Sequence, residues 1–137
     1  MIYLEHLNLV VDDIPKMLTF YQAAFPHWSI RDKGNSDWYG KPRKWLHFGD
    51  DYSYIALSDN GEGGNRNLTG HQVGLAHFAY VTNNLDAMIE RLLLAGFEIA
   101  KDGGDNSYRK NIYFVDPAGF EVEFVEYLSD LPKLRNS

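Results

Sequence analysis

The chain opens with alternating apolar and polar residues. Between Leu7 and Val11, apolar positions share one side, whereas His6 and Asn8 share the other. Such a period of two predicts a strand over residues 4–11 with one apolar face.

A helical pattern follows directly. Residues 12–15, Asp-Asp-Ile-Pro, supply a capping carboxylate and a proline suited to the first turn. We therefore predict a helix that ends near Phe25-Pro26. Its apolar positions at helical spacing are Ile14, Met17, Leu18, Tyr21, Ala24 and Phe25.

The next segment predicts a hairpin after an irregular connection. Strands are expected at 44–48 and 52–58, with a turn at 49–51, and a second strand is weakly indicated around 27–32. The connection itself is aromatic and polar, and it contains Trp28, Trp38, Tyr39 and Pro42.

After a glycine- and asparagine-rich stretch the pattern repeats. Residues 76–82 resemble the first strand, with His6 and His77 standing 71 residues apart. The helical positions repeat at the same offset, from Ile14 and Leu85 onward, and the hairpin repeats from Arg43 to Arg109 at an offset of 66. Such regularity indicates an internal duplication.

The predicted fold class is therefore α+β, with two βαβββ modules in a single domain, 1–137. We expect module one at 1–58, a connector at 59–75, module two at 76–127 and a C-terminal tail at 128–137. Each sheet has one face covered by its helix, so two modules can curve their open faces around a shared cavity.

A carboxylate stands in the last predicted strand among apolar residues. Residues 116–124 form a turn followed by Phe-Glu-Val-Glu-Phe, and an uncompensated Glu123 among core residues would be costly. Alternation places Glu123, His6 and His77 on the open faces. Two imidazoles and a carboxylate can bind a divalent first-row metal, whereas a structural hydrogen-bonding role is the competing interpretation.

Composition narrows the function classes. A net charge of −6 without long charged runs argues against nucleic acid as a partner, and the absence of cysteine excludes disulfides and thiolate sites. The chain shows neither a basic leader nor about 18 consecutive apolar residues, so we expect a cytoplasmic protein without a membrane partner.

These motifs resemble the vicinal oxygen chelate superfamily, which includes glyoxalase, bleomycin-resistance and extradiol dioxygenase proteins. The similarity covers nearly the whole chain and is most specific at residues 5–11, 76–81 and 116–123. It implies that His6, His77 and Glu123 are the metal ligands. The fourth ligand position of glyoxalase I falls on Ala56, which cannot bind metal, so a three-ligand site is expected.

The resemblance implies a small metal-dependent enzyme that chelates two neighbouring oxygens of a small-molecule substrate. A lyase, transferase or dioxygenase fits this class, with Fe, Mn, Zn or Ni as the divalent metal. The alternative is a metal-free binding or sequestration protein similar to bleomycin-resistance proteins. Family members of this length commonly form homodimers with sites shared between chains, and we expect a homodimer here.

Further candidates lie around the predicted site. Glu121 shares the face of Glu123 and is either a general base or a solvated rim residue. The predicted substrate-binding residues are Asn8, Tyr54, Arg109 and Trp38. For His47 a structural role is favoured over a catalytic one, His27 and His71 are expected to face solvent, and the loop aromatics are equally consistent with a lid and with an anchor.

Overall fold

The computed structural model describes residues 1–135 of the chain, which divides into two compact units, Met1–Gly64 and Asn65–Ser137. Each unit contains a four-stranded sheet and a helix of ten or eleven residues that follows its first strand. Within residues 1–135, no helix combines the length and apolar character needed to cross a membrane.

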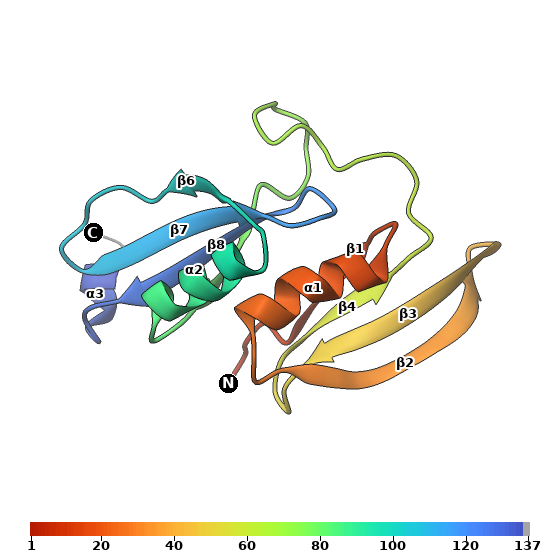
Figure 1. The fold of residues 1–137 in the computed structure, drawn as a ribbon, viewed down its shortest axis with the longest axis horizontal. Helices are drawn as coiled ribbons and strands as arrows, with labels where there is room; N and C mark the ends of the chain where they lie inside the picture. The colour runs from red at the N-terminus through yellow and green to blue at the C-terminus, as the bar shows by residue number, and fades with distance from the viewer. Residues whose placement is uncertain (136–137) are drawn as a thin grey trace. The chain divides into compact units, whose positions relative to one another are not determined.

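The first unit has the element order β-α-β-β-β (Figure 1). Its sheet order is β1-β4-β3-β2, in which β1 and β4 are parallel and the remaining pairs are antiparallel. The elements are β1 (His6–Val10), α1 (Ile14–Ala24), β2 (Ser29–Trp38), β3 (Lys41–Gly49) and β4 (Tyr54–Ser58).

The second unit repeats this order and adds a short terminal helix. Its sheet order, β5-β8-β7-β6, has the same pattern, with β5 and β8 parallel. The elements are β5 (Phe78–Val81), α2 (Leu85–Leu94), β6 (Ile99–Asp102), β7 (Arg109–Val115), β8 (Glu121–Tyr127) and α3 (Pro132–Arg135).

The two long helices begin in the same way. The side chain of Asp13 accepts a hydrogen bond from the backbone N–H of Lys16 at 3.0 Å, and Asn84 accepts one from Ala87 at 3.1 Å. These caps satisfy N–H groups that the first helical turn leaves unpaired. Both helices therefore start at the predicted positions, Ile14 and Leu85.

Each core lies between a helix and one face of its sheet. In the first unit, strand residues such as Phe48 and Leu57 are buried together with Met17 and Tyr21 of α1. In the second, Val122 and Phe124 of β8 are fully buried, as is Leu92 of α2. The alternate strand residues therefore occupy the face that the helix does not cover.

The structure confirms an α+β fold with two βαβββ modules. The second strand was predicted too short, because β2 runs from residue 29 to 38 and pairs with β3 along its whole length. Most β2 residues are exposed and polar, so the strand lacks the apolar alternation that would reveal it. Tyr39 and Gly40, both with positive φ, make the turn instead of a long irregular connection.

Several boundaries also differ from the prediction. β1 starts at His6 rather than residue 4, and β5 starts at Phe78, so that His77 immediately precedes its strand. The predicted tail contains α3, whose four residues are too few to show a helical period. Its last residues, 136–137, lie outside the described part of the chain. The division at residues 58, 75 and 127 stays a prediction.

Candidate functional site

The open face of the second sheet carries the predicted carboxylates. Glu121 and Glu123 of β8 alternate with the buried Val122 and Phe124, and Tyr113 of β7 is the register partner of Glu123. The turn before β8 sets this register. The side chain of the buried Asp116 accepts hydrogen bonds from the backbone N–H groups of Ala118 and Phe120 in that turn.

His77 and Glu123 form a pair at this face. The His77 Nε2 lies 3.1 Å from the Glu123 Oε2, and the Glu123 side chain is only 14% exposed. The other oxygen, Oε1, accepts a hydrogen bond of 2.9 Å from the Asn111 Nδ2. One carboxylate oxygen is thus held by an amide, while the second is directed at an imidazole.

Asn111 is itself fixed by a close contact with Gly103. The Gly103 backbone N–H donates to the Asn111 carbonyl at 3.1 Å, and a Cβ at Gly103 would overlap the Asn111 Oδ1. Among the described residues, this Oδ1 is buried and has no hydrogen-bond partner. Burial of an unpaired amide oxygen is costly, so the Asn111 side chain is held in this orientation by its other contacts, with Glu123 and Gly103.

Glu121 has a different partner. The Lys101 Nζ lies 2.8 Å from its Oε1 and 4.5 Å from the centre of the Tyr113 ring. The hydrogen bond to Glu121 is the main cause that raises the pKa of Lys101. Burial, followed by the charge of Glu123, raises the pKa of Tyr113 and favours its neutral phenol form.

The open face of the first sheet is centred on Tyr54. The His6 ring is stacked on it with centroids 4.5 Å apart, the His47 ring lies at 4.6 Å, and the Arg31 guanidinium lies 4.6 Å from the Tyr54 ring centre. Trp45 extends this cluster, with its ring centre 5.1 Å from that of His47. Predicted substrate-binding residue Tyr54 and predicted ligand His6 are therefore neighbours.

The predicted ligands His6, His77 and Glu123 have nitrogen and oxygen donor atoms that suit a divalent metal. His6 Nδ1 lies 2.8 Å from the Glu5 carboxylate, which favours a tautomer with a free Nε2, and Glu123 is oriented by Asn111. Within each unit, however, the described residues contain no group of three or more His, Asp or Glu side chains suited to a metal. His6 belongs to the first unit and the His77–Glu123 pair to the second, so the three-residue set stays a prediction.

Ala56 of β4 occupies the register position that Glu123 has in the second sheet. Ala56 pairs with Asn8 and His47, and Glu123 pairs with Ala79 and Tyr113. In place of a carboxylate, the first unit has a cavity of about 320 Å³. It is lined by Asn8, Arg43, Trp45, His47, Ala56, Leu57 and Ser58.

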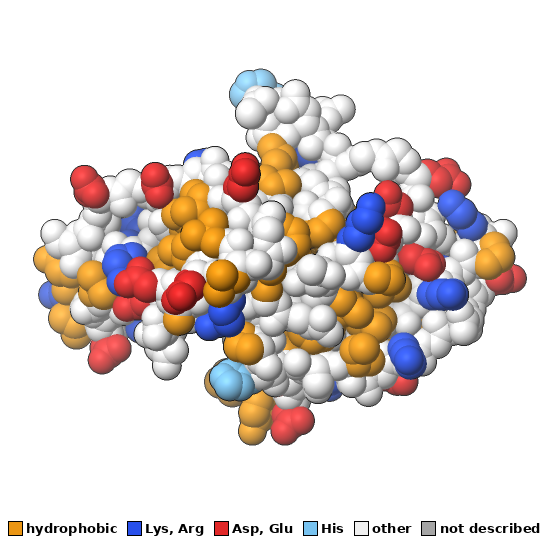
Figure 2. All heavy atoms as spheres, viewed as in Figure 1, with side chains coloured by type: hydrophobic (Ala, Val, Ile, Leu, Met, Phe, Trp, Pro, Cys, Tyr) orange, Lys and Arg blue, Asp and Glu red, His pale blue; other side chains and the backbone are white. Residues whose placement is uncertain are grey.

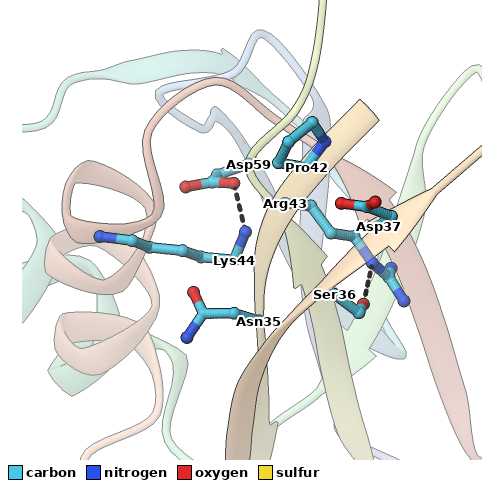
Figure 3. Close-up of a pocket in the computed structure, with 7 residues that line it drawn as sticks. All are labelled: Asn35, Ser36, Asp37, Pro42, Arg43, Lys44 and Asp59. Atoms are coloured by element: carbon cyan, nitrogen blue, oxygen red, sulfur yellow. Dashed lines mark hydrogen bonds between the residues drawn. The ribbon is translucent and has the colours of Figure 1, made fainter. Parts of the chain in front are cut away.

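Arg43 lies at the border of this cavity and a second one, of about 460 Å³ (Figure 3). On that second side, Asn35 and Lys44 point away from Arg43, and the Lys44 backbone N–H donates to Asp59 at 2.7 Å. Lys44 and Arg43 are consecutive residues of β3, so their side chains leave opposite faces of the strand.

The predicted substrate-binding residues Arg109 and Trp38 have partners of their own. Arg109 donates to the Arg135 carbonyl at 3.1 Å and lines a cavity beside the β6–β7 loop, whereas Trp38 lies under the Arg43 guanidinium. Trp28 packs on Phe25, with ring centres 4.4 Å apart, as expected of an anchor. His27 and His71 are exposed, as predicted.

Sequence reasoning missed Asn111 and Lys101, and it used Arg43 only to align the two hairpins. The signal for Asn111 was present, because it lies two residues from Tyr113 and therefore shares its face. Lys101 was hidden in the short strand β6, where no alternation is visible.

On the face of the chain shown in Figure 2, acidic and basic side chains are interspersed over both units.

Comparison with known proteins identifies the family. The sequence profile of the Glyoxalase/Bleomycin resistance protein/Dioxygenase superfamily matches residues 3–124. The chain belongs to this superfamily. A search of curated proteins found no match for the chain.

Solved structures of superfamily members share the fold. A glyoxalase family protein from Bacillus cereus is 14% identical, with a TM-score of 0.74 and coverage of 94% of this chain and 96% of the other. A glyoxylase/bleomycin resistance protein/dioxygenase domain from Frankia is 20% identical, with a TM-score of 0.73 and coverage of 93% and 98%.

The fosfomycin resistance protein FosX from Listeria monocytogenes is also similar. It is 21% identical, with a TM-score of 0.68 and coverage of 90% of this chain and 93% of that protein. Structures of FosX, one of them of a variant, contain Mn(II) together with sulfate or a dihydroxypropylphosphonic acid. At these identities the likeness establishes a common fold.

Proposed function

We propose that this superfamily member is a small metal-dependent enzyme that acts on an oxygenated small molecule. His6, His77 and Glu123 would hold a divalent cation, and two neighbouring oxygens of the substrate would complete the site. When bound, the metal would act as a Lewis acid that stabilises negative charge developing on those oxygens. Manganese is the first candidate, because the similar protein FosX contains Mn(II) in its structures.

The observation that carries this proposal is the His77–Glu123 pair with its Asn111 support. A metal-ligating carboxylate is commonly oriented by a further hydrogen bond, and Asn111 supplies one at 2.9 Å to the oxygen that does not face His77. This orientation of Asn111 leaves its buried Oδ1 without a hydrogen-bond partner among the described residues.

Glu121 is the residue we assign to proton transfer. Its side chain is 11% exposed and lies two residues from Glu123 on the same face of β8. Lys101 at 2.8 Å offsets the charge of Glu121, so that two carboxylates can stand close together on one face. Replacement by glutamine would keep the hydrogen bond to Lys101 while removing the base.

The test is metal binding by purified protein. Calorimetric titration of chelator-treated protein with Mn(II), Zn(II) or Ni(II) should show one site, and His77→Ala should weaken the affinity at least about tenfold. His71→Ala is the matched control, because His71 is exposed in the connector. Equal affinity in both variants, or no binding by the parent protein, would contradict the proposal.

A second function has an observation of its own. The cavity beside Ala56 lies wholly among residues of the first unit and includes none of the proposed metal ligands. A metal-free binding or sequestration protein would need only such a cavity. Tight binding of a small molecule by protein that takes up no metal would favour this function over the enzyme.

We also propose a homodimer, as the resemblance to other superfamily members of this length suggests. The N-terminal residues Met1, Ile2 and Leu4 are strongly exposed and apolar, which is consistent with a surface that a second chain covers. Sedimentation equilibrium should give twice the mass of 15.7 kDa. A single species at the monomer mass would exclude the dimer.

A further inference from the structure

The Arg43 side chain is held rigidly by neutral groups. Its Nη1 donates to the Ser58 Oγ at 2.6 Å, its Nε donates to the Ser36 Oγ at 3.3 Å, and the guanidinium lies 4.7 Å from the Trp38 ring centre. Among the described residues, no carboxylate lies within the 4.0 Å of an ion pair with Arg43. The guanidinium is therefore a positioned cation that forms no ion pair within the described residues.

The cavity next to Arg43 has the composition of a small-molecule site. Its volume of about 320 Å³ suits a compact ligand, and it combines apolar walls with few polar groups. Trp45 and Ala56 supply the apolar surface, and Asn8 and His47 supply hydrogen-bonding groups. Ser58, which accepts the hydrogen bond from Arg43, is only 1% exposed, so the Arg43 guanidinium is held by a buried residue of the first sheet.

The fold itself does not require this polar anchor. At the position of Ser58, the second sheet has Val125, which is 4% exposed, and both residues pair with the last residue of the first strand of their unit. Arg109, the counterpart of Arg43, instead donates to a backbone carbonyl near the C-terminus. The contact between Arg43 and Ser58 is thus a specific property of the first unit.

Arg43 is the charged side chain that lines this cavity, and Asp32, the register partner of His47, is a carboxylate whose charge acts on His47. Burial is the main cause that lowers the pKa of His47, so its imidazole is neutral at pH 7 and can donate one N–H. Asp37 and Asp59 line the second cavity together with Arg43, and neither lines the cavity beside Ala56.

We infer that the cavity beside Ala56 binds the oxyanion of a small organic acid, a carboxylate or a phosphonate, through the Arg43 guanidinium. A planar guanidinium forms paired hydrogen bonds with either group, and Trp45 packs against the apolar part of the acid. The inference rests on the proposed function only in giving that function a substrate class, since no proposed metal ligand lines the cavity.

Titration followed by ¹H–¹⁵N NMR tests the inference. Chelator-treated protein is titrated with benzoate or phenylphosphonate, and benzyl alcohol serves as the uncharged analogue. We expect shifts at residues 56–58 and at His47, and an affinity for the acids at least about tenfold above that for the alcohol. Equal affinity for acid and alcohol, shifts elsewhere, or no binding would overturn the inference.

Two variants identify the cation. Arg43→Gln should weaken acid binding at least about tenfold while keeping an amide donor toward Ser58, and Arg43→Lys should restore part of it. Lys44→Gln is the matched control, because it removes the same charge from the other face of β3. Loss that is equal in the Arg43 and Lys44 variants would overturn the inference.

The measurement is independent of the metal proposal. Chelator-treated protein lacks metal, so a failed metal titration leaves the acid titration intact, and the reverse also holds. If Arg43→Gln does not fold, as judged by its NMR spectrum, the preference of the parent protein for acid over alcohol still decides the question.

Discussion

The two open sheet faces have the same backbone and opposite chemistry. In the second unit, Glu123 is paired with His77, and the neighbouring Glu121 is paired with Lys101. In the first unit, Ala56 stands in the place of Glu123, and the fixed Arg43 guanidinium has no carboxylate partner among the described residues. The second face thus carries the carboxylate of the proposed metal site, whereas the first carries the cation of the proposed acid site.

The faces toward the helices show no such divergence. Phe124 and Leu57 occupy matching positions, pairing with Ile112 and Leu46 respectively, and both are buried. Apolar packing tolerates exchange of one hydrophobic residue for another when the volume is kept. The contrast shows that packing constrains one side of each sheet, whereas the other side is free to specialise.

The largest expected effect tests this similarity of the cores. Phe124→Ala should lower the free energy of unfolding by about 3–5 kcal/mol, and Leu57→Ala by about 2–5 kcal/mol, because each leaves a cavity next to a helix. Urea unfolding followed by circular dichroism measures both values. Losses below about 1 kcal/mol in one unit only would show that its core is not equivalent to the other.

The next prediction concerns two glycines. Gly34→Ala would bring a Cβ to 2.7 Å from the Trp45 ring, and Gly103→Ala would overlap Asn111, so each should cost about 1–3 kcal/mol in urea unfolding. Gly64→Ala is the control, since a Cβ there meets no atom within 4 Å.

Gly103→Ala should also weaken metal binding, because the displaced Asn111 no longer orients Glu123. Gly34→Ala should leave metal binding unchanged. A metal affinity that falls equally in both variants would contradict the assigned role of Asn111.

Ala56→Glu should remove the difference between the two faces. The new carboxylate would enter the cavity beside Arg43 and compete with an added acid, so we expect binding of benzoate to fall at least about tenfold. NMR titration measures this change, with Ala79→Glu as a control at the equivalent face of the second unit. Unchanged benzoate binding would show that the acid lies elsewhere.

The smallest effect is the titration of His47. Because burial lowers the pKa of His47, the unfolded chain takes up a proton more readily, and stability should fall as the pH drops below about 6.5 toward the lower folded pKa. NMR titration of the imidazole should place the pKa of His47 below 6.5. His47→Gln should remove this part of the acid sensitivity, and a midpoint above 6.5 would refute the assignment.

The fold was largely predictable from the sequence. The constant offset between Ile14 and Leu85 corresponds to two helices that start with a side-chain cap and bury residues at matching positions. The strand β2 was not, since its exposed residues carry no alternation. Alternation also placed Glu123 on the open face, where the structure pairs it with His77. Arg43 was missed because the repeat shows only that an arginine recurs at Arg109, whereas the hydrogen-bond partners that distinguish the two are distant in sequence.

Gly34 and Gly103 have a consequence for engineering the protein. Each lacks a Cβ, and the space that a Cβ would take is filled by a side chain of the neighbouring strand, the Trp45 indole in the first unit and the Asn111 carboxamide in the second. A chain carrying Trp45→Asn and Ala56→Glu would have the counterparts of Asn111 and Glu123 in the first unit. Both sheets would then carry a carboxylate with an asparagine beside it on their open faces.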